Sequence, residues 1–436
     1  MKYIKNCLTI CLTLLCILVL ASCVSNTDTI ELETPVVTIS ETGLATWKEV
    51  ENAKGYRYVI SNGEEQLTTE TSVQLENGQT IKVKAVGDGS KYLDSKYSAI
   101  QTFIVKDTKV YGIPTPKTGF YMKNSDLIQE GEVRYLTYVT NKTQGEEDNV
   151  IAVRKATSYE KGWVYEDEVI ALEGTVGGWD EYITSASIVK GVFAYNGTTY
   201  SYLMVYAATS QSNEQCNQIG LAVANSPVET FVKVGTEPVI KYNKDIYNEF
   251  NGCVSPSAIN YDRASGIRIF YTYADAYGHF ARFHDIDCAN LDTIVSVDAS
   301  ATNHITNKGN LAGGEDVLMF PNGDFAYDPT NDRFVCVKDV SPAGSAKPQV
   351  ALSIELCYIA EEDLYTTDVT DGFVSLGTYD GFDLGNNFER IYNATLLSDE
   401  YGHMTSVMEV VYTVSNLQAD DADYIFSQHL LTLIAE

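Results

Sequence analysis

The sequence has few prolines and histidines, and it lacks the motifs of several large enzyme classes. It contains 10 prolines and 5 histidines in 436 residues, and the histidines show no metal-ligand spacing. Neither a G-x-S-x-G nucleophile motif nor a G-x-x-x-x-G-K-[ST] phosphate loop is present. These absences argue against a serine hydrolase of that type and a P-loop enzyme, and they predict a protein with no metal and no cofactor.

Basic residues are scarce. The chain carries 30 Lys and Arg against 59 Asp and Glu, a formal net charge of −29. Such a surface repels DNA, RNA and anionic lipid, so nucleic acid is not expected as a partner. Most of the acidic residues are expected to keep the protein in solution.

Long apolar runs are absent except near the N-terminus. Residues 7–20 are apolar and follow a short basic segment, but this run is too short to cross a bilayer. The adjoining "LASC" resembles a bacterial lipobox that ends at Cys23. The resemblance implies a signal peptide over 1–22, lipid on Cys23, a polar tether over 23–33, and a lipid-anchored position on the extracytoplasmic surface of a bacterial membrane. An ordinary secretory signal or an inner-membrane anchor is the alternative.

Cysteines are few after this segment, and no C-x-x-C spacing occurs. The odd number and wide spacing indicate neither a disulfide framework nor a zinc site, and predict buried free thiols on strands. The cysteines concerned are Cys216, Cys253, Cys288, Cys336 and Cys357.

Tyrosine and glycine, by contrast, are abundant, with 30 and 31 residues, and favour β-structure. Between residues 34 and 106, short segments alternate apolar and polar residues between Asn-Gly turns, which predicts a small antiparallel β-sandwich. The segment resembles a fibronectin type III module, with Trp47, Tyr56 and Tyr58 in its early-strand core. Residues 106–117, with two prolines and a glycine, are predicted to be a linker.

The remaining chain contains internal repeats. Tyr138 and Tyr206 occupy equivalent places 206 − 138 = 68 residues apart, and the segments 149–156 and 217–224 match at the same offset. Further units begin at 267–275, 332–339 and 408–415. Repeated sheets of about four short strands are typical of β-propellers. The sequence therefore predicts an all-β protein, with an N-terminal β-sandwich followed by a five-bladed β-propeller over 118–436.

Three segments of the propeller resemble glycoside hydrolase family 43 and its relatives. Residues 185–240 resemble their second blade, with an aromatic strand ending in Tyr and then Ile-Gly-Leu-Ala and Ser-Pro. Residues 255–275 resemble the opening of the third blade, and 390–402 the last blade. The resemblance implies a sugar site on the propeller axis, lined from the innermost strand of each blade, and an oligosaccharide or polysaccharide as partner.

The stretch "GGWDEYITSASIVKG", residues 177–191, places an aromatic residue and two acids just before a predicted inner strand. We expect Trp179 to offer a flat face to a sugar ring, and Asp180 and Glu181 to lie near the axis. The other blades carry acidic residues at the same place. These are Asp126, Glu249, Glu315, Asp316 and Glu389, the last beside Arg390.

Hydrolysis of a glycosidic bond needs one protonated and one ionised carboxyl group. The leading catalytic candidates are Asp180 with Glu315 or Asp316. The remaining candidates are assigned to substrate binding: Trp179, Glu181, Asp126, Glu249, Glu389 and Arg390.

The sequence departs from the family at the expected catalytic positions. Asn124 stands where the family has its base, Ser185 replaces the second-blade Asp, and Cys253 or Val254 occupies the position of the third-blade Glu. Three hypotheses therefore remain: a hydrolase whose catalytic acids lie on loops, a non-catalytic glycan-binding lipoprotein, or an adhesion protein that contacts other proteins.

Overall fold

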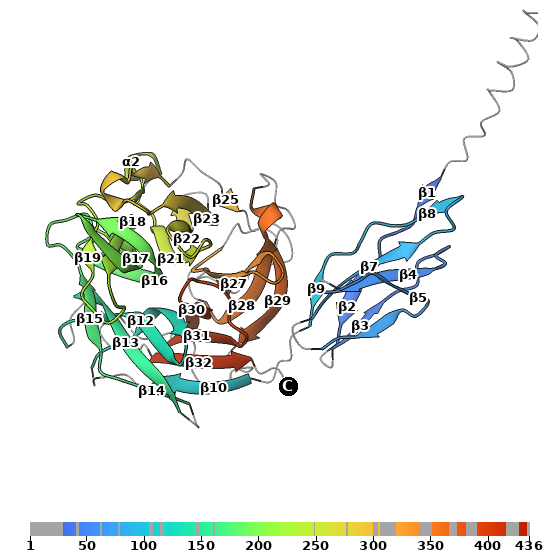
Figure 1. The fold of residues 1–436 in the computed structure, drawn as a ribbon, viewed down its shortest axis with the longest axis horizontal. Helices are drawn as coiled ribbons and strands as arrows, with labels where there is room; N and C mark the ends of the chain where they lie inside the picture. The colour runs from blue at the N-terminus through green and yellow to red at the C-terminus, as the bar shows by residue number, and fades with distance from the viewer. Residues whose placement is uncertain are drawn as a thin grey trace, which may run out of the picture. The chain divides into compact units, whose positions relative to one another are not determined.

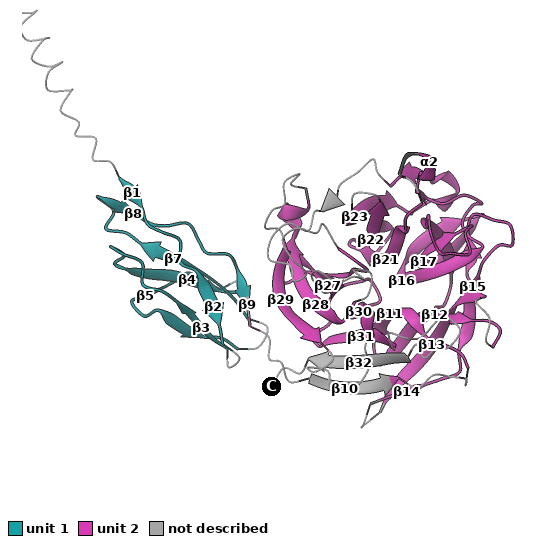
Figure 2. Cartoon of the chain, turned by 180° about the vertical axis from the view of Figure 1, so that it is seen from behind, with its two compact units in different colours: residues 1–102 teal, residues 103–436 magenta. Residues whose placement is uncertain are grey.

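The structure is a computed structural model in which two compact units, residues 1–102 and 103–436, follow one another (Figure 2). The residues that it describes are 29–40, 43–61, 63–76, 79–103, 108–113, 117, 119–144, 148–159, 162–247, 249–275, 278–299, 304–305, 320–340, 351–365, 373–380, 390–415 and 427–433.

The first unit is a β-sandwich. Its strands are β1 (Ile30–Glu31), β2 (Val37–Ile39), β3 (Leu44–Trp47), β4 (Gly55–Ile60), β5 (Gln66–Thr68), β6 (Ser72–Gln74), β7 (Thr80–Val86), β8 (Tyr92–Leu93) and β9 (Gln101–Thr102). A three-stranded sheet, β2-β3-β6, and a four-stranded sheet, β5-β4-β7-β9, form its layers. Trp47 and Tyr56 are buried with ring centroids 5.6 Å apart, and the alternating residues of β7 bury Ile81, Val83 and Ala85.

The second unit is the predicted five-bladed propeller. Blade one contains β11 (Lys123–Glu130), β12 (Val133–Asn141), β13 (Asn149–Tyr159), β14 (Gly162–Tyr165) and β15 (Val169–Glu173). Blade two contains β16 (Tyr182–Tyr195), β17 (Thr198–Thr209), β18 (Gln218–Ala224), β19 (Val232–Lys233) and β20 (Ile240–Lys241), with β24 (Val297–Asp298) at its edge. Blade three contains β21 (Gly252–Asn260), β22 (Gly266–Asp275), β23 (Gly278–Asp287) and β25 (His304–Ile305). Blade four contains β26 (Asp324–Asp328), β27 (Arg333–Val340), β28 (Ser353–Ala360) and β29 (Phe373–Asp380). Blade five contains β30 (Arg390–Asp399), β31 (Met408–Ser415), β32 (Ser427–Leu433) and β10 (Thr108–Ile113). Short helical turns are α2 (Lys244–Tyr247), η1 (Leu291–Thr293) and η2 (Glu361–Tyr365).

The blades surround a common centre (Figure 1). The innermost strand of each blade contacts that of the next, in the order β11, β16, β21, β26 and β30, and β30 pairs in parallel with β11. A separate hydrophobic cluster fills each of the five junctions between neighbouring blades. Burial of both faces of every blade is what allows such short sheets to be stable.

Blade five is completed by the strand that comes first in the unit. β10 pairs antiparallel with β32 along all six of its residues. Residues 108–113 therefore belong to the propeller, which corrects the prediction of a linker over 106–117. The short edge strand contains a glycine and is followed by a proline, a composition typical of a linker. Its pairing partner lies more than 300 residues away in the sequence.

A ring of buried polar side chains joins the inner strands. We call Asp126, Ser187, Ser257, Asp324 and Thr395 the inner ring. Four of its members accept hydrogen bonds from the backbone N–H groups of the next blade: Ile188 N to Asp126 (2.9 Å), Ala258 N to Ser187 (3.2 Å), Phe325 N to Ser257 (3.1 Å) and Leu396 N to Asp324 (2.7 Å). Thr395 donates its hydroxyl to Asp324 at 2.8 Å. The fifth junction uses the parallel pairing of β30 and β11 instead. The inner ring thus fixes the spacing of the blades.

One end of the axis is covered by the turn that follows β30. The backbone of this closing turn, residues 399–404, accepts hydrogen bonds from Lys190 N, Asn260 N and Tyr327 N, in blades two, three and four. His403 is buried, with Nε2 3.0 Å from the carbonyl oxygen of Asn260. Gly402 has φ +79°, and a Cβ there would meet the Ala258 carbonyl at 2.5 Å, so only glycine fits.

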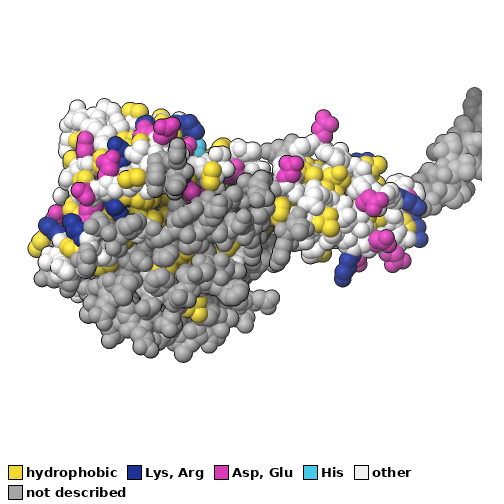
Figure 3. Space-filling model, turned by 90° about the horizontal axis from the view of Figure 1, so that it is seen from below, with side chains coloured by type: hydrophobic (Ala, Val, Ile, Leu, Met, Phe, Trp, Pro, Cys, Tyr) yellow, Lys and Arg dark blue, Asp and Glu magenta, His cyan; other side chains and the backbone are white. Residues whose placement is uncertain are grey.

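On the face drawn in Figure 3, acidic and basic side chains of the described residues are interspersed on each unit rather than gathered by sign. Within the described part of the chain, no helix is long and apolar enough to cross a membrane. The five cysteines after the N-terminal segment are buried, as expected.

We predict that β10 is required for a stable propeller. A chain that starts at residue 104 should fold, whereas one that starts at residue 114 leaves β32 without its partner and loses hydrogen bonds worth about 0.5–1.5 kcal/mol each. Thermal unfolding should show a lower transition temperature or no cooperative transition for the shorter chain. Equal transitions for the two chains would contradict this role.

Candidate functional site

The end of the axis opposite the closing turn carries four polar residues in an unusual backbone conformation. Asn124, Ser255, Asn322 and Asn393 come from four different blades and have φ of 52°, 49°, 46° and 48°. All four are half-buried. We call them the mouth ring. They lie near the N-terminal ends of the inner strands, whereas the closing turn covers the opposite ends.

The left-handed conformation of Asn124, Ser255 and Asn393 occurs at bulges in the inner strands, the one at Ser255 lying between Val254 and Ser257. The register shifts between Lys123 and Asp126 in β11, and between Tyr392 and Thr395 in β30. A bulge inserts one extra residue and turns its side chain away from the normal alternation. Asn is among the residues that tolerate positive φ best. Consequently each bulge presents a short polar side chain to the axis.

Hydrogen bonds connect the mouth ring into a nearly continuous circle. Asn393 Nδ2 donates to Asn124 Oδ1, and Asn124 Nδ2 donates to the Thr184 carbonyl oxygen at 2.5 Å. Ser255 N donates to Ser185 Oγ (3.2 Å), and Ser255 Oγ donates to Asn322 Oδ1 (3.4 Å). Blade two therefore takes part through Thr184 and Ser185.

Asp339 of β27 connects two members of the mouth ring, Asn322 and Asn393. Its carboxylate accepts from Asn322 Nδ2 and from Asn393 N, both at 2.7 Å. The residue is only 2% exposed, and burial raises its pKa to about 7 although these hydrogen bonds and the nearby Arg390 oppose the rise. With both oxygens occupied, Asp339 orients the mouth ring and does not face solvent.

Charged groups stand beside the mouth ring. Arg390 stacks over Tyr392 at 3.9 Å, and its Nε is buried without a hydrogen-bond partner among the described residues. Glu214, on the loop between β17 and β18, accepts from Lys123 Nζ (3.2 Å) and Asn149 Nδ2 (2.8 Å), and its side chain is 41% exposed. Burial raises the pKa of the Tyr392 phenol, and the charge of Glu214 adds to the rise.

Asp126, predicted to bind substrate, belongs to the inner ring. It is 6% exposed and accepts from Ile188 N, so its carboxyl group joins blades one and two. Burial, together with the like charge of Asp324, raises its pKa to about 8. Asp324 is half-buried as a residue, and burial of its carboxyl group raises its pKa although several hydrogen bonds oppose the rise. Two buried carboxyl groups in one low-dielectric centre disfavour each other's ionisation.

Asp180, the leading catalytic candidate, lies at the core between blades one and two. Its carboxylate contacts Lys233 Nζ at 2.5 Å and accepts from Tyr206 Oη at 3.1 Å, and the residue is 3% exposed. Trp179 stacks on Tyr206 with centroids 5.7 Å apart, over Gly220, where a Cβ would meet both rings. The carboxylate of Glu181 accepts from Gly177 N in the same loop. This stretch is thus held by packing and by an ion pair, apart from the mouth ring.

The other predicted residues are dispersed. Glu249 is exposed, beside α2 at the entry to blade three. Arg390, as described, stands beside the mouth ring. Glu315, Asp316, Glu389 and the predicted lipidation site Cys23 lie outside the described residues. The mouth-ring asparagines, Asp339 and Glu214 were not predicted as site residues, although Asn124 and Ser185 were noted as departures from the family.

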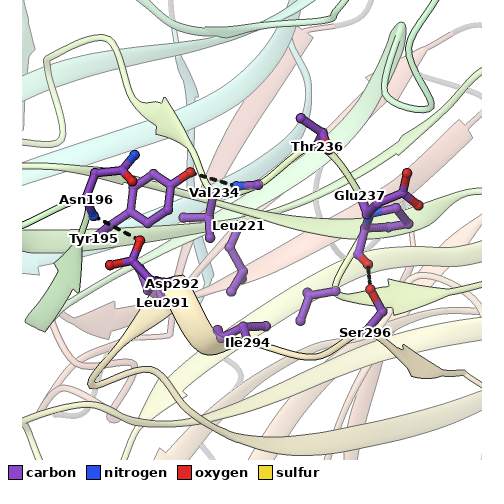
Figure 4. Close-up of a pocket in the computed structure, with 13 residues that line it drawn as sticks. Tyr195, Asn196, Leu221, Val234, Thr236, Glu237, Leu291, Asp292, Ile294 and Ser296 are labelled. Carbon is purple, nitrogen blue, oxygen red and sulfur yellow. Dashed lines mark hydrogen bonds between the residues drawn. The ribbon is translucent and has the colours of Figure 1, made fainter.

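A cavity of about 280 Å³ lies elsewhere, at the outer side of blade two (Figure 4). Tyr195, Val234 and Leu291 line it, and the Tyr195 hydroxyl accepts from Gly235 N at 3.0 Å. None of the predicted site residues lines this cavity. Among the described residues, no group of three His, Cys, Asp or Glu side chains is arranged to hold a metal ion.

The mouth ring offers amide and hydroxyl groups that both donate and accept hydrogen bonds. It does not offer a general base at Asn124, because an amide does not take up a proton near neutral pH. The carboxyl groups described at this end are Asp339, which is buried, and Glu214, which is accessible. The arrangement is therefore suited to binding neutral hydroxyl-rich molecules.

Solved structures similar to this chain are glycoside hydrolases. An endo-arabinase from Bacteroides thetaiotaomicron has 10% identity and a TM-score of 0.44, with 74% of this chain and 97% of that chain covered. An α-L-arabinofuranosidase from Lactobacillus brevis has 9% identity and a TM-score of 0.46, covering 71% and 90%. A thermostable family-43 glycoside hydrolase has 13% identity and a TM-score of 0.45, covering 75% and 93%. No protein-family model matches the chain, and no curated protein matches its sequence. Likeness at these values carries no conclusion about chemistry.

We predict that the inner ring makes the propeller less stable as pH rises. Because the pKa of Asp126 rises from 3.8 to about 8, the native state keeps a proton that the unfolded chain has lost between these values. Stability contributed by the protonated group is therefore lost as pH increases from about 4 to 8. Asp126→Asn should reduce that decline by on the order of 1–3 kcal/mol.

The measurement is urea unfolding at pH 5 and pH 8. The exposed Asp167→Asn serves as the control and should leave the pH dependence unchanged. A wild-type protein that becomes more stable toward pH 8, or an Asp126→Asn variant with the same slope as wild type, would oppose this assignment.

We also predict that Asp180 is needed for stability. Asp180→Ala leaves Lys233, whose side chain is 23% exposed, without a carboxylate and with only the hydroxyl of Thr175 as partner, and should lower the free energy of unfolding by about 2–4 kcal/mol. The exposed pair of Lys142 and Glu173, at 2.7 Å with both side chains at least half exposed, gives a matched control. Glu173→Ala should cost less than about 1 kcal/mol. Denaturant unfolding checks both, and equal small losses would argue against a structural role.

Proposed function

We propose that this protein is an exported lipoprotein whose propeller binds extracellular oligosaccharides at the mouth ring. The observation that carries the proposal is the mouth ring itself, which brings Asn124, Ser255, Asn322 and Asn393, all half-buried, from four blades to one end of the axis. Ordered amides and hydroxyls are the groups that hydrogen-bond sugar hydroxyls and fix their orientation.

Rigidity supports this proposal. Asp339 and the bulged backbone hold the asparagine side chains in place before a ligand arrives. A site that is ordered in advance loses less conformational entropy on binding.

In this proposal the lipid on Cys23 holds the protein at the bacterial membrane surface, and the sandwich, as a fibronectin type III-like module, separates the propeller from the membrane. The net charge of −29 is consistent with a solvated protein outside the cytoplasm.

A second candidate function is hydrolysis. Glu214 has a carboxylate that is 41% exposed, and burial raises the pKa of Asp339 to about 7, so this end of the axis carries two carboxyl groups in different surroundings. Binding is the better supported function, because both oxygens of Asp339 already accept hydrogen bonds from the protein. Glu315 and Asp316 remain candidates for a catalytic role within this second function.

Calorimetric titration with a panel of oligosaccharides, arabino-oligosaccharides included, tests the proposal. Asn124→Gly and Asn393→Gly remove the amides, while glycine keeps the positive φ without strain. Loss of one or two hydrogen bonds should weaken binding about tenfold per variant.

Asn196→Gly is the matched control, because Asn196 also has a positive φ of 50° but lies in an exposed hairpin of blade two. It should bind as wild type does. Release of reducing ends that is abolished by Glu214→Gln would favour hydrolysis. Unchanged affinity in both mouth-ring variants would place the binding site elsewhere.

A further inference from the structure

Two buried cysteines face each other on the central strands of blade four. Cys336 of β27 and Cys357 of β28 are direct partners in the antiparallel register, and their Sγ atoms are 3.1 Å apart. Both residues are fully buried in the hydrophobic cluster between blades three and four. Cys253 and Cys288, by comparison, belong to the cluster between blades two and three.

The backbone geometry is compatible with a covalent bond. Directly opposed residues of antiparallel strands have Cα atoms about 4.5–5.5 Å apart, within the range of about 4.4–6.8 Å that disulfides span. The sulfur atoms need to approach by about 1 Å to reach the bond length of about 2.05 Å. The register of β28 against β29 shifts between Leu356 and Cys357, and the backbone at such a bulge bends locally. Cys357 can therefore make this movement without displacing the whole ladder.

We propose that Cys336 and Cys357 form a disulfide by exchange with a dithiol–disulfide oxidant while blade four folds. The thiolate of one cysteine attacks the disulfide of the oxidant, and one oxidant thiol leaves. The second cysteine then attacks this mixed disulfide, and the other oxidant thiol leaves. Two protein thiols become one S–S bond, and their two electrons and two protons reduce the oxidant to a dithiol.

Burial of the two thiols determines at which stage of folding the exchange occurs. The thiolate is the reactive form, and burial raises the pKa of Cys336 well above its usual range. The pair therefore reacts before the core closes around it, and the folded reduced protein resists oxidation. Disulfides persist in oxidising compartments, so the occurrence of this bond in the cell rests on the export proposed above. Formation of the bond by the isolated protein does not depend on export.

The test is oxidative refolding of the full chain. The protein is reduced and unfolded, refolded in a buffer of reduced and oxidised glutathione, alkylated in denaturant, and mapped by mass spectrometry without reduction. We expect a peptide linking Cys336 to Cys357 in most molecules, which reductant removes. The melting temperature should be a few degrees higher than after refolding with reductant.

Controls separate this pair from other thiols. Cys288→Ser should keep the linked peptide, and Cys336→Ser should lose it. Protein that is folded in its reduced state before the same buffer is added should form the link at least tenfold more slowly.

Recovery of both cysteines only in alkylated form, or of Cys336 linked equally to several cysteines, would overturn the pairing. Equal rates in the folded and refolding protein would overturn its timing. Neither a glycan nor a membrane enters the assay, so its failure would leave the proposed function untouched.

Discussion

The hydrogen bonds between side chains of one inner strand and the backbone of the next are the constraint on which the propeller depends. Within the inner ring, Ser187, Ser257 and the two aspartates each accept a hydrogen bond from a backbone N–H group of the neighbouring blade. That blade has no further strand on its inner side to accept this hydrogen bond. Buried N–H groups without partners are costly. These contacts therefore determine both how closely the blades approach and how each inner strand is turned toward the axis.

The same constraint explains the position of the candidate site. Once the inner ring fixes the middle of each inner strand, the bulges near the strand starts direct Asn124, Ser255 and Asn393 to the end opposite the closing turn. Asp339 then links two of them, although it belongs to a second strand. The electrostatics follow from this arrangement, because the blades bury the carboxyl groups of Asp126 and Asp339 together with the N–H groups that they accept from.

Much of the fold could be predicted from the sequence. The 68-residue offset between Tyr138 and Tyr206 reflects equivalent strands, β12 and β17, in successive blades, and the predicted all-β sandwich and propeller are confirmed. β10 could not be predicted, because a strand of six residues shows too little alternation to identify a partner at the other end of the chain. Pairing between strands that are so far apart in the sequence depends on closure of the ring of five blades.

The site was harder to predict for two physical reasons. A bulge reverses side-chain alternation, so Asp126 points into the inner ring while Asn124, two residues earlier, reaches the mouth ring. The loop before β16 was expected near the axis because of its acids. Stacking of Trp179 on Tyr206 and the ion pair with Lys233 instead hold it beside the junction of blades one and two. Both outcomes depend on neighbours that are distant in sequence.

The pairing of β10 with β32 also bears on the order in which the molecule is made. The first strand of the propeller emerges during synthesis long before its partner, and no other described strand pairs with it. Blade five therefore cannot be completed until almost the entire chain is available, however early blades one to four acquire their local hairpins. A ring assembled in this way closes in one late step, and a nascent chain that still lacks β32 has no closed propeller.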